Sequence, residues 1–249
     1  MNIFFESFFF TKDRQEHYTF EIQEEYENNN GDISKFRGAL RCPECREAEL
    51  AFTHKTSTRR EYLSKIPSSN HLDGCSYIYD YANKTELGAF IKGLDGKKLR
   101  DRLEATLNML SSLSAEKNPC KSIIKGNNPF VININSKNTV VSRSIPRKSL
   151  NLYLDKDLEN RTFIFYGKVK LYVEKFEAKK DKEEYYRLKI YTKKKDGSWV
   201  YKSEVFRGKQ EDIIQEDRVY EIAMFGHLDF THSKSPQIKL ESKDALLYR

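Results

Sequence analysis

The sequence predicts an α+β protein, in which an N-terminal α/β domain with two helices is followed by an all-β C-terminal domain of five strands. Three observations support this prediction. Three of the four cysteines lie between Arg41 and Tyr77, together with a histidine. Leucines then recur at helical spacing from Leu99 to Leu110, and from Thr162 onward apolar and polar residues alternate with a period of two.

The cysteine-rich stretch carries two pairs of metal-ligating residue types, Cys42 to Cys45 (CPEC) and His71 to Cys75 (HLDGC). A Cys-x2-Cys pair lets two thiolates reach one ion from a tight turn. A His-x3-Cys pair then completes a tetrahedron of three sulfurs and one nitrogen, the set that structural zinc prefers. We therefore predict one structural Zn²⁺ ion with four protein ligands and no open position for water. Two alternatives stay open: His54 replaces one ligand, or Cys42 and Cys45 are small apolar residues beside a turn.

The same stretch resembles the zinc-binding N-terminal region of competence CoiA-like bacterial proteins. The resemblance rests on the two ligand pairs and on the basic ribbon with Arg59-Arg60-Glu61-Tyr62 between them, and it covers about residues 36–80. It implies a zinc module of the ribbon kind, which such families often join to a nuclease domain. No nuclease core is evident in the rest of this sequence. Glu241-Ser242-Lys243 has a Glu-x-Lys spacing, but a highly charged chain supplies such triplets by chance.

Length, charge and cysteine usage narrow the class of protein. The chain has 249 residues, a formal net charge of +7 and a pI near 9, which allow two modest domains and favour a polyanionic partner. Cysteines in a metal pattern indicate a reducing compartment, so we expect a cytoplasmic protein. The apolar start Met1–Phe10 contains Glu6, lacks the features of a signal peptide and is too short to cross a bilayer, so we expect a soluble protein with no membrane partner.

We expect the zinc-binding domain to span residues 1–115. Alternation predicts strands at Ile3–Phe10 and Tyr18–Glu24, and a two-stranded ribbon between the ligand pairs at Glu49–His54 and Arg59–Ser64. Two helices follow, near Glu86–Leu94 and after Asp95. The second helix carries a stripe that is most simply core packing, with a partner-helix role as the alternative: Leu99, Leu103, Leu107 and Leu110.

Residues 116–160 are rich in Ser, Asn and Lys and contain several prolines, so we expect a linker or bridging segment. Within it, Phe130–Ile134 and Thr139–Val141 predict a small hairpin.

Residues 161–249 are expected to form the all-β domain. Predicted strands are Thr162–Val173, Tyr185–Thr192, Trp199–Phe206, Val219–Leu228 and Gln237–Leu240, with one or two helical turns at Gly208–Gln215. Gly167 permits a bend or bulge in the first strand. The order of three strands, a short helix and two strands resembles the OB-fold, a five-stranded barrel, and a small SH3-like barrel is the alternative.

The polar face of the first two barrel strands alternates tyrosines with cations. Aromatic rings stack on bases and cations track phosphates, so this face suits single-stranded nucleic acid. The OB-fold resemblance implies that oligonucleotides bind here and at the flanking loops, Lys175–Glu184 and Phe230–Pro236, with Lys179, Lys180 and Lys182 adding charge. The alternative is an ordinary solvated sheet face or a protein-binding barrel. The candidate residues are Tyr166, Lys168, Lys170, Tyr172, Tyr185, Arg187, Lys189 and Tyr191.

Three functional hypotheses follow. The first is a non-catalytic protein that binds single-stranded DNA or RNA and holds a structural zinc. The second is a zinc-containing nuclease of DNA metabolism or phage defence, with carboxylates at scattered positions such as Asp73, Asp80 and Asp101. The third is an adaptor that recruits a protein partner through the barrel or through the Leu99–Leu110 helix.

Overall fold

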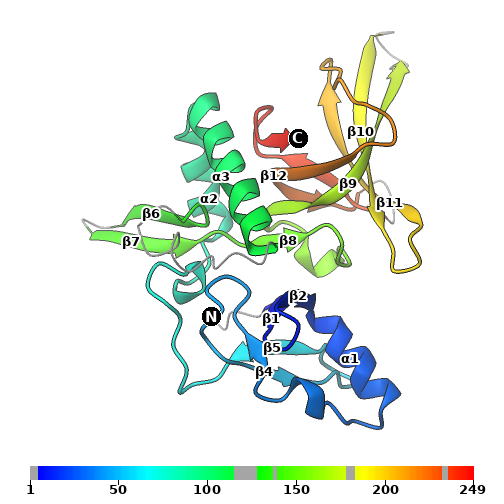
Figure 1. Ribbon diagram of the computed structural model, residues 1–249. Helices are drawn as coiled ribbons and strands as arrows, with labels where there is room; N and C mark the ends of the chain where they lie inside the picture. Colours follow the sequence, from blue (N-terminus) through cyan, green and yellow to red (C-terminus); the bar gives the residue numbers. More distant parts are fainter. Residues whose placement is uncertain (1–4, 115–127, 137–138, 178–182, 232–234) are drawn as a thin grey trace. The chain divides into compact units, whose positions relative to one another are not determined.

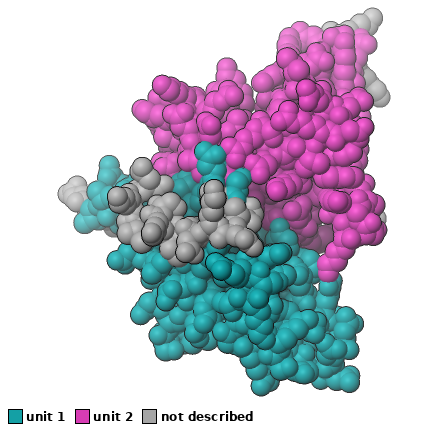
Figure 2. Space-filling view, in the orientation of Figure 1, with its two compact units in different colours: residues 1–81, 108–144 teal, residues 82–107, 145–249 magenta. Residues whose placement is uncertain are grey.

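The computed structural model describes residues 5–114, 128–136, 139–177, 183–231 and 235–249. The chain divides into two compact units, each built from two separate stretches (Figure 2). Unit 1 comprises residues 1–81 and 108–144, and unit 2 comprises residues 82–107 and 145–249. This division does not coincide with the boundaries at 115 and 160 that the sequence suggests. Among the described residues, no helix has the length and apolar character needed to cross a membrane.

Unit 1 is built from short elements (Figure 1). Its described strands are β1 Ser7–Phe10, β2 Gln15–Tyr18, β3 Leu40–Arg41, β4 Leu50–Thr53, β5 Tyr62–Lys65, β6 Val131–Ser136 and β7 Thr139–Ser144. Its other elements are helix α1 Thr19–Asn28 and the short 3-10 helices η1 Ser34–Phe36 and η2 Ser76–Ile78. The strands pair as a three-stranded sheet in the order β2-β1-β3 and as two antiparallel ribbons, β4-β5 and β6-β7. The ribbon expected between the ligand pairs and the hairpin expected after residue 130 are both confirmed.

The strand expected at Tyr18–Glu24 is wrong, because Tyr18 is the last residue of β2 and residues 19–24 are the first part of α1. The alternation of Tyr18, Phe20 and Ile22 suggested a strand, yet the chain buries Thr19, Ile22 and Gln23, which share one face of a helix. Glu21 also favours helix initiation, since its carboxylate accepts a hydrogen bond from the backbone N–H of Tyr18 at 2.9 Å.

The core of unit 1 is small and includes the three cysteines predicted to bind a metal. Cys42, Cys45 and Cys75 are buried together with a few apolar side chains from β1, α1, β4 and β5, among them Phe8, Ile22, Leu50 and Leu63. The site and the core of this unit are therefore one structure.

Unit 2 contains the large sheet. Its described elements are α2 Lys84–Lys92, β8 Arg147–Ser149, the 3-10 helix η3 Lys156–Leu158, β9 Thr162–Glu177, β10 Glu184–Lys193, β11 Trp199–Gly208, β12 Val219–Asp229, β13 Gln237–Leu240 and β14 Leu246–Tyr248. Helix α3, Gly96–Ser114, begins in unit 2 and ends in unit 1. The expected helices are thus confirmed as α2 and α3, and three leucines of the expected stripe, Leu99, Leu103 and Leu107, are buried.

Five strands of the large sheet pair in a closed circuit. β9 pairs antiparallel with β10, and β10 pairs antiparallel with β11. β11 pairs parallel with β13, β13 pairs antiparallel with β12, and β12 returns to pair antiparallel with β9. β8 and β14 add short pairings to β9 and β12. The apolar residues that face the inside of this circuit form the core of unit 2, which includes Phe165, Leu171, Leu188, Val205 and Ile222.

Two local expectations for this region are corrected. The segment after β11 forms no helix over Gly208–Gln215. Asp212 of this segment is buried and forms an ion pair with Arg207 at 2.8 Å. The register between β9 and β12 runs through Gly167 without a shift, so no bulge occurs there. Leu150 packs closely against this glycine: an added Cβ would lie 3.3 Å from the Cβ of Leu150, a tight contact.

The segment expected to be a linker, residues 116–160, contributes to both units where it is described. β6 and β7 belong to unit 1, whereas β8 extends the large sheet of unit 2 by pairing in parallel with β9. Of these strands, β6 and β7 form the expected hairpin, whereas β8 was not expected from the sequence.

Candidate functional site

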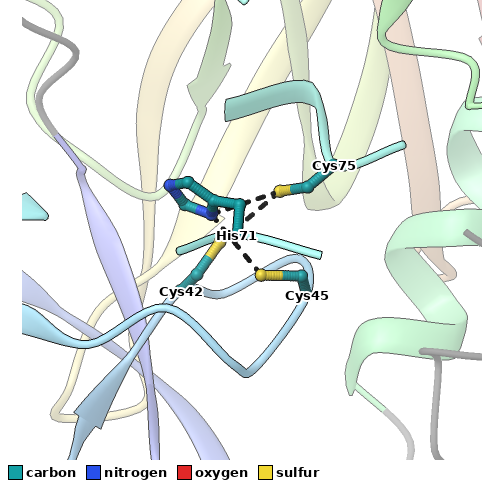
Figure 3. A group of neighbouring side chains, drawn as sticks. All are labelled: Cys42, Cys45, His71 and Cys75. Atoms are coloured by element: carbon teal, nitrogen blue, oxygen red, sulfur yellow. Dashed lines mark hydrogen bonds between the residues drawn. The ribbon is translucent and has the colours of Figure 1, made fainter. Parts of the chain in front are cut away.

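The four predicted metal ligands lie together (Figure 3). One donor atom from each of Cys42, Cys45, His71 and Cys75 lies within 4.8 Å of the others. The Cys42 and Cys75 sulfurs are 3.8 Å apart, and His71 Nδ1 is 3.4 Å from the Cys45 sulfur and 3.5 Å from the Cys75 sulfur. Around an ion with metal–sulfur bonds of about 2.3 Å, tetrahedral geometry places two sulfurs about 3.8 Å apart and a sulfur and a nitrogen about 3.6 Å apart. The donor separations therefore fit a tetrahedrally bound metal ion.

The local backbone explains how each ligand pair is presented. The Cys42–Cys45 turn closes through a hydrogen bond from the Arg46 N–H to the Cys42 carbonyl at 2.9 Å, and Arg46 takes a positive φ of 60° to complete it. Gly74 takes a φ of +82°, and the Cys75 N–H donates to the Leu72 carbonyl at 3.1 Å. A glycine suits this position because residues with a Cβ adopt positive φ at a cost.

The thiols perturb one another strongly. Burial raises the pKa of Cys42 well above its usual range, and hydrogen bonds from Cys42 and Cys45 raise the pKa of Cys75. Hydrogen bonds from Cys42 and Cys75 lower the pKa of Cys45. A bound divalent cation offsets the cost of three buried thiolates, which is the electrostatic basis of a thiolate metal site.

A buried carboxylate beside the ligands was not predicted from the sequence. Glu44 is fully buried and accepts hydrogen bonds from the Ser76 N–H at 2.6 Å, from Ser76 Oγ at 2.5 Å and from Asn128 Nδ2 at 2.7 Å. Asn128 Nδ2 also donates to the Gly74 carbonyl at 2.8 Å. Glu44 therefore ties the first ligand pair to the second and to the residues before β6. The signal for this role in the sequence was the position of Glu44 inside the CPEC turn. An acidic side chain with no structural role there would be expected to face solvent.

The structure chooses between the two histidines that the sequence offered as ligands. The His71 ring lies among the sulfurs and is roughly parallel to the ring of Phe5, at 6.1 Å between ring centroids. The His54 ring instead stacks on Tyr26 at 4.7 Å. Asp73, Asp80 and Asp101 are exposed and belong to no group of candidate metal ligands within the described part of the chain.

The candidate nucleic-acid residues separate into two sets. Six lie across the β9–β10 pairing, where Tyr172 is opposite Lys189 and Lys170 is opposite Tyr191, with Tyr185 and Arg187 further along β10. Tyr166 and Lys168 lie on the part of β9 that pairs with β12, opposite Ala223 and Glu221. The structure therefore brings together six of the eight. Of the flanking loops, Lys179, Lys180 and Lys182 fall outside the described residues, as do residues 232–234.

Sequence reasoning missed three aromatic residues on the same face, Phe176, Tyr201 and Phe206. Tyr191 lies edge-on to Tyr172 at 5.0 Å and to Tyr201 at 5.7 Å. These three rings are the tyrosine cluster. At the other end of the face, Tyr185 lies 6.0 Å from Phe176 and 5.9 Å from Phe206. These three are the phenylalanine cluster. Phe176 was expected in the loop after the first strand, but β9 continues to Glu177, and the signal was the alternation that runs on past Val173. The pairing of β10 with β9 and with β11 brings the rings together.

Charges between the two clusters are balanced by carboxylates that were also not anticipated. Lys189 pairs with Glu174 at 2.6 Å, and Lys170 pairs with Asp217 at 2.6 Å. Arg187 lies 3.6 Å from Glu204. The hydrogen bond to Glu174 raises the pKa of Lys189, and the one to Asp217 raises that of Lys170. The face is therefore rich in rings and close to neutral, and phosphates would have to displace these ion pairs.

Comparison of the chain with protein-family models, with curated proteins and with solved structures finds no match in any of the three.

Proposed function

We propose that this protein binds single-stranded nucleic acid on the outer face of β9, β10 and β11, and that a zinc ion holds unit 1 together. The observation that carries the proposal is the pair of aromatic clusters at the two ends of one sheet face. Each ring that stacks on a base contributes about 1–3 kcal/mol, with little dependence on sequence, because every base has an aromatic face.

The strand circuit supports an OB-type barrel. In that fold the first strand pairs with the second and the fourth, and the third pairs in parallel with the fifth. The circuit β9-β10-β11-β13-β12 follows this order. The described connection between β11 and β12 lacks the short helix, and β8 and β14 are additions. The second and third strands of such a barrel carry the usual binding face, which here holds Tyr191, Tyr201 and Phe206.

Stacking, more than phosphate attraction, is the expected source of affinity. The cations between the clusters already have carboxylate partners, so each phosphate contact exchanges one ion pair for another. Surface ion pairs of this kind contribute only about 0–1 kcal/mol, so the exchange is feasible.

Tyr191→Ala is a direct test of the proposed binding face, because Tyr191 contacts both other rings of the tyrosine cluster. Its loss should weaken binding of a labelled single strand of about 12 nucleotides by roughly 5- to 100-fold, as measured by fluorescence anisotropy. Tyr153→Ala is the matched control, since Tyr153 is 73% exposed and lies outside the face. Equal affinity of the two variants would refute this binding face.

The zinc proposal rests on the donor set. Three thiolates and one imidazole at tetrahedral separations suit zinc better than calcium or magnesium, which take oxygen ligands. Bound zinc would join the two ligand pairs into one crosslinked structure, and thiolate ligands imply the reducing conditions of a cytoplasm. Elemental analysis of freshly purified protein should find close to one zinc per chain; its absence would overturn the assignment.

A further inference from the structure

A hollow of about 380 Å³ opens in unit 2 beside β13, next to the phenylalanine cluster. This volume is within the range of small-ligand sites. Its walls come from the end of β11, the segment that follows, β13 and the turn after it. Polar and aromatic residues predominate in the lining, among them Phe206, Arg207, Gln210, Gln237, Lys239 and Lys243. Among the described residues that line the hollow, none is acidic.

One of its three cations remains available to a ligand. Arg207 makes a two-point contact with Asp212 at 2.8 and 3.2 Å, and Lys239 pairs with Asp229. Lys243 forms no ion pair with any described residue. A ligand with one negative group can therefore bind Lys243 without breaking the Arg207–Asp212 or the Lys239–Asp229 ion pair.

The wall that carries Lys243 is firmly held. The side chains of Arg207 and Asp212 are only 5% and 4% exposed. Arg207 Nη1 also donates to the backbone carbonyl of Lys243 at 3.3 Å, and the Tyr248 hydroxyl donates to Asp212 at 3.2 Å. Burial and the Asp212 charge raise the pKa of Tyr248 to about 12. The hydroxyl thus stays protonated as a donor, and the turn is fixed before a ligand arrives.

Phe206 belongs both to the phenylalanine cluster and to the hollow. Its side chain is 49% exposed and lies 5.9 Å from Tyr185 on the proposed binding face. The amides of Gln210 and Gln237 offer the donor and acceptor groups that match base edges. Gln237 donates to Glu204 at 3.4 Å, so its carbonyl oxygen is the group that faces no described donor.

We infer that this hollow is a nucleotide subsite: it takes one nucleotide of the bound single strand, with the base against Phe206 and near the two amides, and with a phosphate at Lys243. This inference rests on the proposed function, because the strand reaches the hollow from the aromatic face. It adds a place where base identity is read, which the stacking face does not supply.

The test compares Lys243→Ala with Lys156→Ala, an exposed lysine on η3, in anisotropy titrations of the full chain with labelled single strands. Lys243→Ala should weaken binding about three- to tenfold and reduce the slope of log K against log salt by about one, the expected result of losing one phosphate contact. Lys156→Ala should match the wild-type protein. Gln210→Ala should reduce the difference in affinity among homopolymeric A, C and T strands.

The outcomes separate the two proposals. If Lys243→Ala and Gln210→Ala behave like Lys156→Ala while Tyr191→Ala weakens binding, the subsite is refuted and the binding face stands. If no single strand binds but a mononucleotide such as deoxyadenosine monophosphate binds, and Lys243→Ala removes that binding, the hollow is a nucleotide site and the face is refuted. If neither probe binds, both proposals fall.

Discussion

At the scale of single residues, Glu44 shows how much one side chain adds to the candidate metal site. Its buried carboxylate receives three hydrogen bonds from Ser76 and Asn128, and it sits between two metal-ligating cysteines. Groups that orient metal-ligating residues through hydrogen bonds commonly affect both stability and metal affinity.

Glu44→Gln should therefore destabilise unit 1. Glu44 now offers two oxygens to the donors of Ser76 and Asn128, whereas the glutamine would replace one oxygen with an NH₂ group, which is itself a donor. Leaving buried polar groups without a partner costs about 1–3 kcal/mol. Urea unfolding monitored by circular dichroism measures the change. Glu47→Gln, on an exposed residue of the same turn, is the matched control and should lie close to the wild-type protein. Equal stability of both variants would contradict the role given to Glu44.

At the scale of elements, strands with one buried face could be predicted and the helix α1 could not. Val169, Leu171, Leu188 and Ile190 are buried as their alternation predicts. In α1, the alternation of Tyr18, Phe20 and Ile22 resembled a strand because two of the three residues that the helix buries, Thr19 and Gln23, are polar. The ligand spacing similarly predicted the metal cluster. It could not predict Asn128, whose contact with Glu44 joins residues 84 positions apart in the sequence.

β11 carries the clearest pH-dependent group of the sheet, Lys202. Burial, and then the positive charge of Lys148, lower its pKa from 10.5 to about 8. Between about pH 8 and 10 the unfolded chain holds a proton at this lysine that the folded chain has released, so stability should rise with pH. Below pH 8 Lys202 is protonated in both the folded and the unfolded state, so the cost of burying its charge reduces stability in full.

Lys202→Met should therefore stabilise the protein at pH 7, and its advantage should shrink as the pH approaches 10. Free energies of unfolding of the wild-type protein and the variant at several pH values give this difference directly. Lys193→Met, on an exposed lysine of β10, is the matched substitution. A constant difference across the pH range would show that Lys202 does not titrate as described.

At the scale of the whole molecule, the two units have separate cores, and the candidate metal cluster found among the described residues belongs to unit 1. Because three cysteines form part of a small core, metal binding should supply much of the folding free energy of unit 1. Unit 2 buries its own larger core within the strand circuit and should not depend on the ion.

Removal of the metal with a chelator, or Cys75→Ser, should unfold unit 1 and leave unit 2 folded. The single tryptophan of the chain, Trp199, lies on β11, so its fluorescence reports on unit 2 alone. Circular dichroism should lose signal on chelation while the Trp199 thermal transition stays in place, and added zinc should restore the signal. If chelation lowered the temperature of the Trp199 transition as well as the circular dichroism signal, the independence of the two units would be contradicted.

The most direct test of the central claim is an anisotropy titration of the full chain with matched single- and double-stranded oligonucleotides across a salt series. Base stacking on the two aromatic clusters requires accessible base faces, which a duplex hides. We predict that the single strand binds at least about tenfold more tightly, with a slope of log K against log salt of about −2, as expected for roughly three phosphate contacts. Equal affinity for the two forms, or no binding at low salt, would contradict the claim.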